Sequence, residues 1–493
     1  MNNSMEWELN GLVNGLVNWQ ANGQVNGQVN GQVNGGQRQS PAAHATSGTG
    51  TAMMMPAYPH AVEGAIMQPP LQQQAPWFWD WALQLAGPVR PPYAYPMLQP
   101  PESAMCTRST FFVETDPARS LSCRMYVECL VPVIIAEPLP IILIHGDFHT
   151  GQIWLTKPDG NPGWASFFCH HGQPVYVVDL PAVGRSNINC RAADLARLSK
   201  PAGTMDEVTV ERELTAPGKQ AIEAWPGARS HDKWPGTGLR GDPVFNNYCA
   251  SLVPLQFTKV DRQILAQDAL GQLLERTGRA VLIGEGTGAT AAWLVADIKP
   301  DLVAAVIAVE PTGPPAGTAV RMGADGVRYY TPRIEPAPGT RPYGLADIPL
   351  TWDPPIGMPH AGAAEGDGQQ ALDLLTALWQ DGISSCILQR ASTMIFPEGA
   401  PVGHVPDPRR LVNLAKMRHA IVTGQASPHS TFDWATAHFM RQAGVSTFRM
   451  PLDKYNIYGN GHLMFLETNS DEIADLISSW ISLNVTDVPE QLP

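Results

Sequence analysis

A glycine-rich corner in residues 280–294 constrains the fold of this chain more than any other stretch. It begins with a short apolar run typical of a buried strand and ends with residues that favour a helix. Between the two, Gly284 and Gly288 flank Gly286 at the spacing Gly-x-x-x-Gly. So sharp a strand-to-helix turn lifts the residue at its tip above the sheet. Here that residue is Gly286, which has no side chain to present.

Composition excludes several classes of protein. The net charge of −13 argues against binding to the nucleic-acid backbone, which requires a positive surface. No pair of cysteines has the Cys-x-x-Cys spacing of a zinc site, and no motif for another metal, a nucleotide or a flavin is present. We therefore expect neither a metal nor a cofactor.

The first part of the chain differs from the rest. An Asn-Gly-Gln-Val repeat runs from Asn22 to Asn34, and polar repeats bury too little apolar surface to offset the entropy of ordering. We expect residues 1–75 to be disordered and 76–493 to form one domain. The chain shows no secretory signal peptide and no run of about 20 apolar residues that would span a membrane. These features predict a soluble, cytoplasmic protein.

Beyond residue 105 the pattern alternates between strands and helices, which is typical of an α/β fold with a mostly parallel sheet covered on both faces. Residues 111–113 and 125–130 favour an opening antiparallel pair, and 471–483 favour a closing helix. The strands expected between them lie at 141–144, 175–179, the apolar run 280–283 before the glycine corner, 302–309, 419–423 and 446–450.

Five phrases in one order carry a resemblance to a known family. They are His-Gly-Asp-Phe-His-Thr-Gly at 145–151, Trp-Pro-Gly-Thr-Gly at 234–238, Val-Glu-Pro-Thr-Gly-Pro-Pro at 309–315, Tyr-Gly-Leu-Ala-Asp-Ile-Pro-Leu-Thr at 343–351, and Gly-Asn-Gly-His at 459–462. The chain resembles the α/β-hydrolase superfamily, and within it an esterase-like bacterial and fungal branch. The resemblance implies the α/β-hydrolase fold with a lid insertion. It makes the corner a nucleophile elbow, with Gly286 in place of the nucleophilic serine.

The resemblance also implies an oxyanion hole, in which backbone N–H groups face the negative charge that develops during acyl transfer. One donor comes from the turn after the strand at 141–144, at Asp147 or its neighbour Gly146. The other comes from Thr287, the residue after the elbow tip. The alternative for His145 and Gly146 is a turn that ends a strand, with a packed histidine.

A histidine and an acid complete the implied site. His462 stands where the family places its general base. The acid that orients this histidine is implied at Glu310, one helix and one strand after the elbow. The rival is Asp433, inside a probable helix after the next strand, and Glu310 is preferred.

Gly286 leaves the nucleophile unassigned and three explanations open. The chain is a non-catalytic binding protein, or it performs serine-independent chemistry as a lyase, isomerase or cyclase with His462 and Glu310 as a general base, or it carries a deliberate serine-to-glycine change. Glu285 stands where this branch more often has histidine, and we expect it to point away from the substrate.

Two insertions, 180–257 and 313–410, are expected to determine specificity. The second stands where this fold builds a lid, and residues 371–379 favour an apolar helix within it. A bulky, mainly apolar small molecule is the expected ligand. Two hypotheses follow: an esterase- or lactonase-like enzyme with a serine-independent variant, or an inactive hydrolase-like binding protein.

Overall fold

The main sheet has the strand order β1-β2-β4-β3-β6-β7-β14-β15 in the computed structural model, with β5 (Asn187–Ile188) paired to β2. These strands are those found in the described residues, which are 106–116, 118, 122–188, 203–322, 328–356, 372–378, 384–391 and 407–485. The region predicted to be disordered, residues 1–75, lies outside them.

Six consecutive strands of the sheet are parallel, as the alternating pattern predicted. They are β4 (Val175–Asp179), β3 (Ile141–Ile144), β6 (Ala280–Glu285), β7 (Val303–Val309), β14 (Arg418–Thr423) and β15 (Thr447–Pro451). At one edge, β1 (Cys106–Glu114) and β2 (Cys123–Pro132) form the predicted antiparallel pair.

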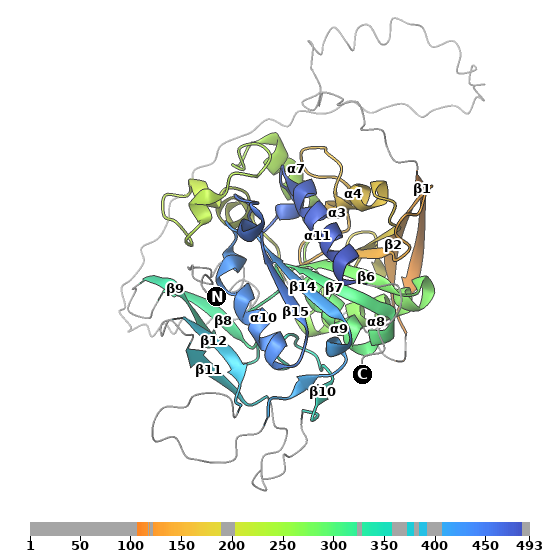
Figure 1. Ribbon diagram of the computed structural model, residues 1–493. Helices are drawn as coiled ribbons and strands as arrows, with labels where there is room; N and C mark the ends of the chain where they lie inside the picture. The colour runs from red at the N-terminus through yellow and green to blue at the C-terminus, as the bar shows by residue number, and fades with distance from the viewer. Residues whose placement is uncertain are drawn as a thin grey trace, which may run out of the picture. The chain divides into compact units, whose positions relative to one another are not determined.

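Helices cover both faces of this sheet (Figure 1). On β6, Leu282 packs into the core on one side and Ile283 into the core on the other, which explains the continuous apolar run of this strand. One face carries α8 (Lys259–Thr277), α9 (Thr287–Ile298) and α10 (Asp433–Gln442), and the other α4 (Trp164–His170), α7 (Pro243–Ser251) and α11 (Ser470–Asn484). The α/β-hydrolase fold is confirmed.

Short elements fill the connections. The segment after β3 holds α3 (Gln152–Leu155), and the described part of the first insertion holds α6 (Glu207–Val210) ahead of α7. Asp242 begins α7 by accepting hydrogen bonds from the N–H groups of Val244 and Phe245, a typical N-cap. No helix in the described ranges is both long and apolar enough to cross a membrane.

The second insertion contains paired strands where a helix was expected. Three antiparallel pairs form, β8 (Gly317–Met322) with β9 (Arg328–Pro336), β10 (Trp352–Asp353) with β13 (Arg410–Leu411), and β11 (Leu374–Leu378) with β12 (Ser385–Gln389).

The predicted helix at 371–379 is therefore wrong across Leu374–Leu378. The Leu- and Ala-rich composition of this segment favours a helix. Pairing with β12 overrides that preference, because β12 places Cys386 and Ile387 in a core shared with Phe432 and Ala435 at the start of α10.

Candidate functional site

The elbow retains the backbone of a nucleophile turn. Gly286 has φ 55° and ψ −116° between the end of β6 and the start of α9. Gly284 and Gly288 are required by close approach, since a Cβ on Gly284 would lie 2.5 Å from the backbone of Gly288 and one on Gly288 would lie 2.5 Å from the carbonyl oxygen of Ile144. A Cβ on Gly286 would meet nothing within 4 Å. The tip of the elbow is thus open and has room for a side chain.

The turn at residues 145–148, which is predicted to supply one oxyanion-hole donor and is called the oxyanion turn below, follows β3 and contacts the start of α9. Asp147 accepts a hydrogen bond from the hydroxyl of Thr287 at 2.9 Å and pairs with Arg262 at 3.0 Å, so its carboxylate ties the two predicted donor residues together. Within the described part of the chain, the backbone N–H groups of Asp147 and Thr287 have no acceptor. The N–H of Gly146 differs, because it donates to Glu285 Oε2 at 2.7 Å.

His145 is a packed histidine, as the alternative for this turn proposed. Its Nε2 accepts a hydrogen bond from the N–H of Leu180 at 3.0 Å, and Nδ1 lies 2.7 Å from the carbonyl oxygen of Gly146. Burial lowers the pKa of this imidazole. A neutral, internally bonded ring in this position holds the turn in shape.

His462 and Glu310 lie together, as expected from their places in the sequence. His462 Nδ1 is 2.7 Å from Glu310 Oε2, and both side chains are buried. Glu310 is fixed by two further donors, the N–H of Gly424 at 2.8 Å and the hydroxyl of Ser427 at 2.6 Å. The pair has the geometry of an acid that orients a histidine, and the catalytic role of each residue remains a prediction.

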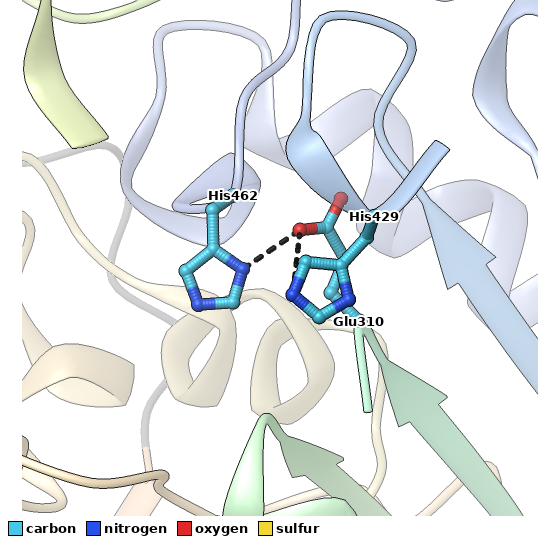
Figure 2. Close-up of side chains that lie close together, drawn as sticks. All are labelled: Glu310, His429 and His462. Carbon is cyan, nitrogen blue, oxygen red and sulfur yellow. Dashed lines mark hydrogen bonds and ion pairs between the residues drawn. The ribbon is translucent and has the colours of Figure 1, made fainter. Parts of the chain in front are cut away.

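The rival acid Asp433 binds a different histidine. His429 Nδ1 lies 3.2 Å from Asp433 Oδ1, and His429 Nε2 lies 4.0 Å from Glu310 Oε2. Figure 2 shows that His429 and His462 both contact the carboxylate of Glu310. Their rings are stacked, with 5.0 Å between the ring centroids. The sequence drew no attention to His429. Its one signal is the position four residues before Asp433.

The group Glu310, His429 and His462 brings three metal-ligating side chains within 4.8 Å of one another. A bound ion must lie near the plane of each imidazole that ligates it through a nitrogen lone pair. The two rings are only 12° from parallel, so their lone pairs do not converge on one point. We therefore describe this group as a hydrogen-bonded cluster and assign no metal to it.

We expected Glu285 to point away from the substrate. This expectation is wrong, because the side chain points into the site. Its Oε1 lies 3.3 Å from His462 Nε2, and its Oε2 lies 3.2 Å from His149 Nδ1. Burial alone would raise the pKa of this carboxyl, but the neighbouring His149 and His462 hold that pKa well below its usual range. Glu285 is therefore an ionised group at the centre of the site.

His462 consequently lies between two carboxylates. Burial works against a charged imidazole, but the hydrogen bonds to Glu285 and Glu310 outweigh burial and raise the pKa of His462 to about 10. At neutral pH both ring nitrogens carry protons. A general base needs an unprotonated nitrogen, and His462 does not offer one in this arrangement.

A second buried pair holds the loop that carries His462. Glu467 accepts hydrogen bonds from the N–H of Gly461 at 2.9 Å and from the side chain of Asn460 at 2.7 Å, and it lies 2.7 Å from His231 Nε2. This explains the Gly-Asn-Gly-His phrase, in which the residues before His462 bind the supporting carboxylate. No sequence pattern indicated the partners Glu467 and His231.

An apolar pocket opens beside the oxyanion turn. Its polar lining includes Asp147 and Thr287, together with Lys259 and Arg262 on α8. The apolar residues of its lining are Phe148, Leu180, Pro181, Val183, Leu255, Ala266 and Ala291. The pocket is suited to an apolar group whose polar end reaches the turn.

Comparisons with known proteins agree with this architecture. A sequence model described as the alpha/beta hydrolase family matches residues 141–476. A probable secreted lipase from Fungal sp. (strain ATCC 74256) is 34% identical over 365 residues, which cover 72% of this chain and 85% of the relative. In sequence the chain is therefore similar to the alpha/beta hydrolase family and to a probable lipase.

Two solved structures are among the proteins to which the chain is similar. One is a novel bacterial esterase, 18% identical with a TM-score of 0.46, which covers 77% of this chain and 96% of the esterase. Another is naproxen esterase from Bacillus subtilis, 10% identical with a TM-score of 0.33, which covers 77% of this chain and 92% of that protein.

The prediction of a cytoplasmic protein is contradicted by the curated relative, which is a probable secreted lipase. That prediction depended on finding no signal peptide in the sequence, and a missing pattern is a weak basis for assigning a compartment.

Proposed function

Because the chain belongs to the alpha/beta hydrolase family, we propose that it is an esterase- and lipase-like protein that binds an apolar ester or lactone without forming an acyl-enzyme. The observation that carries this proposal is Gly286 at the tip of a complete elbow. Covalent catalysis of ester cleavage requires a hydroxyl, thiol or carboxylate there. Glycine supplies none of these groups.

No neighbouring side chain takes over as nucleophile. Glu285 is 2% exposed, its Oε2 accepts a hydrogen bond from the N–H of Gly146, and its Oε1 forms an ion pair with His462. The hydroxyl of Thr287 donates to Asp147. His462 is directed at carboxylates through both ring nitrogens. The route through an acyl-enzyme is therefore closed at each group near the elbow.

The means of holding an ester remain. Among the described residues, the backbone N–H groups of Asp147 and Thr287 have no acceptor and can bind a carbonyl oxygen, and the pocket beside them has mostly apolar walls. This combination favours a ligand with an apolar body and one carbonyl group. The paired strands of the 313–410 insertion pack against the start of α10, and we propose that this insertion covers the ligand.

A second candidate function is serine-independent chemistry, in which water attacks the ester directly or the acid–base group acts on a substrate as a lyase, isomerase or cyclase would. The observation that favours it is the open space at Gly286, which has room for a water molecule where a serine hydroxyl would lie. Such chemistry needs His462 to give up the proton on Nε2. Activity by this route would therefore increase as pH rises toward about 10, the pKa of His462.

One experiment separates these functions. The parent and Gly286→Ser are incubated with a fluorophosphonate at neutral and alkaline pH and analysed by intact mass, with Gly286→Ala as the control for filling the space. We expect no adduct on the parent or on Gly286→Ala, and one adduct on Gly286→Ser. An adduct on the parent would reveal another nucleophile and overturn the proposal.

Binding and turnover are then measured directly on the parent. A series of p-nitrophenyl esters of increasing chain length tests hydrolysis, and matching non-hydrolysable ketones test binding by calorimetry. Binding that strengthens with chain length, without release of p-nitrophenol, supports the binding function. Multiple turnovers that increase with pH would instead establish the serine-independent hydrolase.

We also propose that the protein is secreted, a proposal supported by its similarity to the probable secreted lipase. The test is to measure the intact protein in culture medium and in cell extract. Retention of all of the protein inside the cell would contradict the proposal.

A further inference from the structure

Glu285 is the feature of the elbow that the proposed function does not use. It precedes the empty position 286, and it connects three parts of the site. Its contacts are the N–H of Gly146 in the oxyanion turn at 2.7 Å, His149 Nδ1 at 3.2 Å and His462 Nε2 at 3.3 Å. One buried carboxylate thus joins the elbow, the turn and the histidine.

The side of the network behind Glu285 is fixed by Tyr248. His149 Nε2 lies 2.8 Å from the hydroxyl of Tyr248. Burial, together with the charge of Glu285, raises the pKa of Tyr248 well above its ordinary value, so this hydroxyl keeps its proton and can donate a hydrogen bond to His149 Nε2. Because Nε2 is then the acceptor, the hydrogen of His149 lies on Nδ1, which donates a hydrogen bond to Glu285. Glu285 is left to accept a further donor through its other oxygen.

His462 is that donor. A carboxylate without a proton only accepts hydrogen bonds, so a nitrogen directed at it must carry hydrogen. Both nitrogens of His462 form ion pairs with carboxylates, Nδ1 with Glu310 at 2.7 Å and Nε2 with Glu285 at 3.3 Å. In a serine hydrolase the second nitrogen would instead accept the proton of the serine hydroxyl.

We propose that Glu285 is a positioning residue that takes the place of the missing serine as the partner of His462, keeps this histidine doubly protonated and ties it to the oxyanion turn. The inference rests on the proposed function and deepens it. Loss of the serine and gain of the carboxylate together turn the general base into a fixed cation.

The groups around His462 support this assignment. Glu310 comes from the end of β7 and Glu285 from the end of β6, and His429 stacks on the ring from the loop before α10. Behind these groups lie His149, which donates to Glu285, and Asp433, which binds His429. Two negative groups touch His462 directly, and Glu285 is the one that holds the nitrogen needed for catalysis.

The test is a pH titration of His462 in the full-length protein. The protein is labelled with ¹⁵N-histidine, and NMR of the imidazole nitrogens monitors the titration. His462→Gln identifies the signal. In the parent we expect both nitrogens of His462 to be protonated at neutral pH, with a titration midpoint in the alkaline range. In Glu285→Gln, which keeps an oxygen acceptor for Gly146 but removes the charge, we expect the midpoint to fall by roughly 1–3 pH units.

Matched variants separate this role from simple packing. Glu285→Asp restores the charge and should bring the midpoint back toward that of the parent. Asp433→Asn, a neutralised carboxylate on the other histidine, should leave the midpoint of His462 nearly unchanged. In Glu310→Gln the midpoint should stay above about 6.5, the ordinary value for histidine, because Glu285 remains.

A neutral His462 in the parent at neutral pH would overturn the proposal, as would the same midpoint in Glu285→Gln and the parent. If Glu285→Gln fails to fold, the parent and Glu310→Gln titrations decide the question alone. None of these measurements depends on a ligand. A protein that binds no ester but shows the expected titration refutes the proposed function and leaves the role of Glu285 intact.

Discussion

Two carboxylate–histidine pairs lie side by side in this protein and differ in their neighbours. Glu310–His462 and Asp433–His429 are both buried, and their rings stack at 5.0 Å. His462 also reaches a second carboxylate, Glu285, at 3.3 Å. Asp433 lies 3.2 Å from His429 and 2.8 Å from the hydroxyl of Thr423, and His429 is 4.0 Å from the second carboxylate near it, Glu310.

A comparison of two carboxylates, Asp433 and Glu285, shows that the neighbouring histidines, rather than burial, determine the direction of the pKa shift. Burial raises the pKa of Asp433, and the nearby His429 does not offset it. Glu285 is buried to the same degree, yet two histidines keep its pKa well below the usual range. Equal burial therefore accompanies opposite shifts, and the number of partners decides the sign.

The largest expected difference between the pairs lies in reactivity. In the Gly286→Ser background, His462→Ala should slow fluorophosphonate labelling at alkaline pH by about 10³-fold or more, because the serine loses its base. His429→Ala in the same background should slow labelling by less than about 10-fold, since this ring touches only the acid. Labelling rates by intact mass give both numbers. Equal losses would show that the two pairs act as one unit.

The next difference concerns the stability of the protein. Glu310→Gln should reduce the free energy of unfolding by about 3 kcal/mol, because it removes one partner of a buried charged pair and disturbs the donors Gly424 and Ser427. Urea denaturation at neutral pH measures this change. A loss below about 1 kcal/mol would mean that Glu285 alone satisfies the buried imidazolium.

The pH dependence of stability sharpens the comparison for His462. Its pKa is raised from 6.5 to about 10 on folding. The stabilisation from this group is fully present below pH 6.5 and is lost as pH rises through about 10. The urea midpoint of the parent should fall over this range, and that of His462→Gln should fall less. Parallel curves for the two proteins would contradict the prediction.

The smallest effect is expected at Asp433. Its pKa is raised on folding, so its ionisation opposes the folded state increasingly as pH rises above the unfolded value of 3.8. Asp433→Asn removes this opposition and should change the free energy of unfolding at neutral pH by less than about 1 kcal/mol, with the variant gaining on the parent as pH rises. A large loss at neutral pH would show that Asp433 is ionised and paired.

The sequence predicted the parts of the site that depend on local pattern. The elbow follows from three glycines within five residues, and its backbone has the expected form at Gly286. Glu310 and His462 follow from their places after β7 and β15, because the ends of parallel strands meet at one edge of the sheet.

The parts that were missed depend on contacts between distant segments. The direction of Glu285 is set by Gly146, His149 and His462, none of which is near it in the chain. His429 gains its importance from stacking on a ring 33 residues away in sequence, which no periodicity reveals. The strand Leu374–Leu378 forms because β12 is available to pair with it, against its own helical preference.

The open space at Gly286 leaves room at this position for an introduced reactive side chain. A cysteine introduced there would stand at the tip of the elbow with no atom within 4 Å of its Cβ. Small disulfide-bearing fragments could then be captured one at a time, with the apolar pocket beside the turn selecting among them. The fragments captured at position 286 would then indicate the shape of ligand that the pocket accepts.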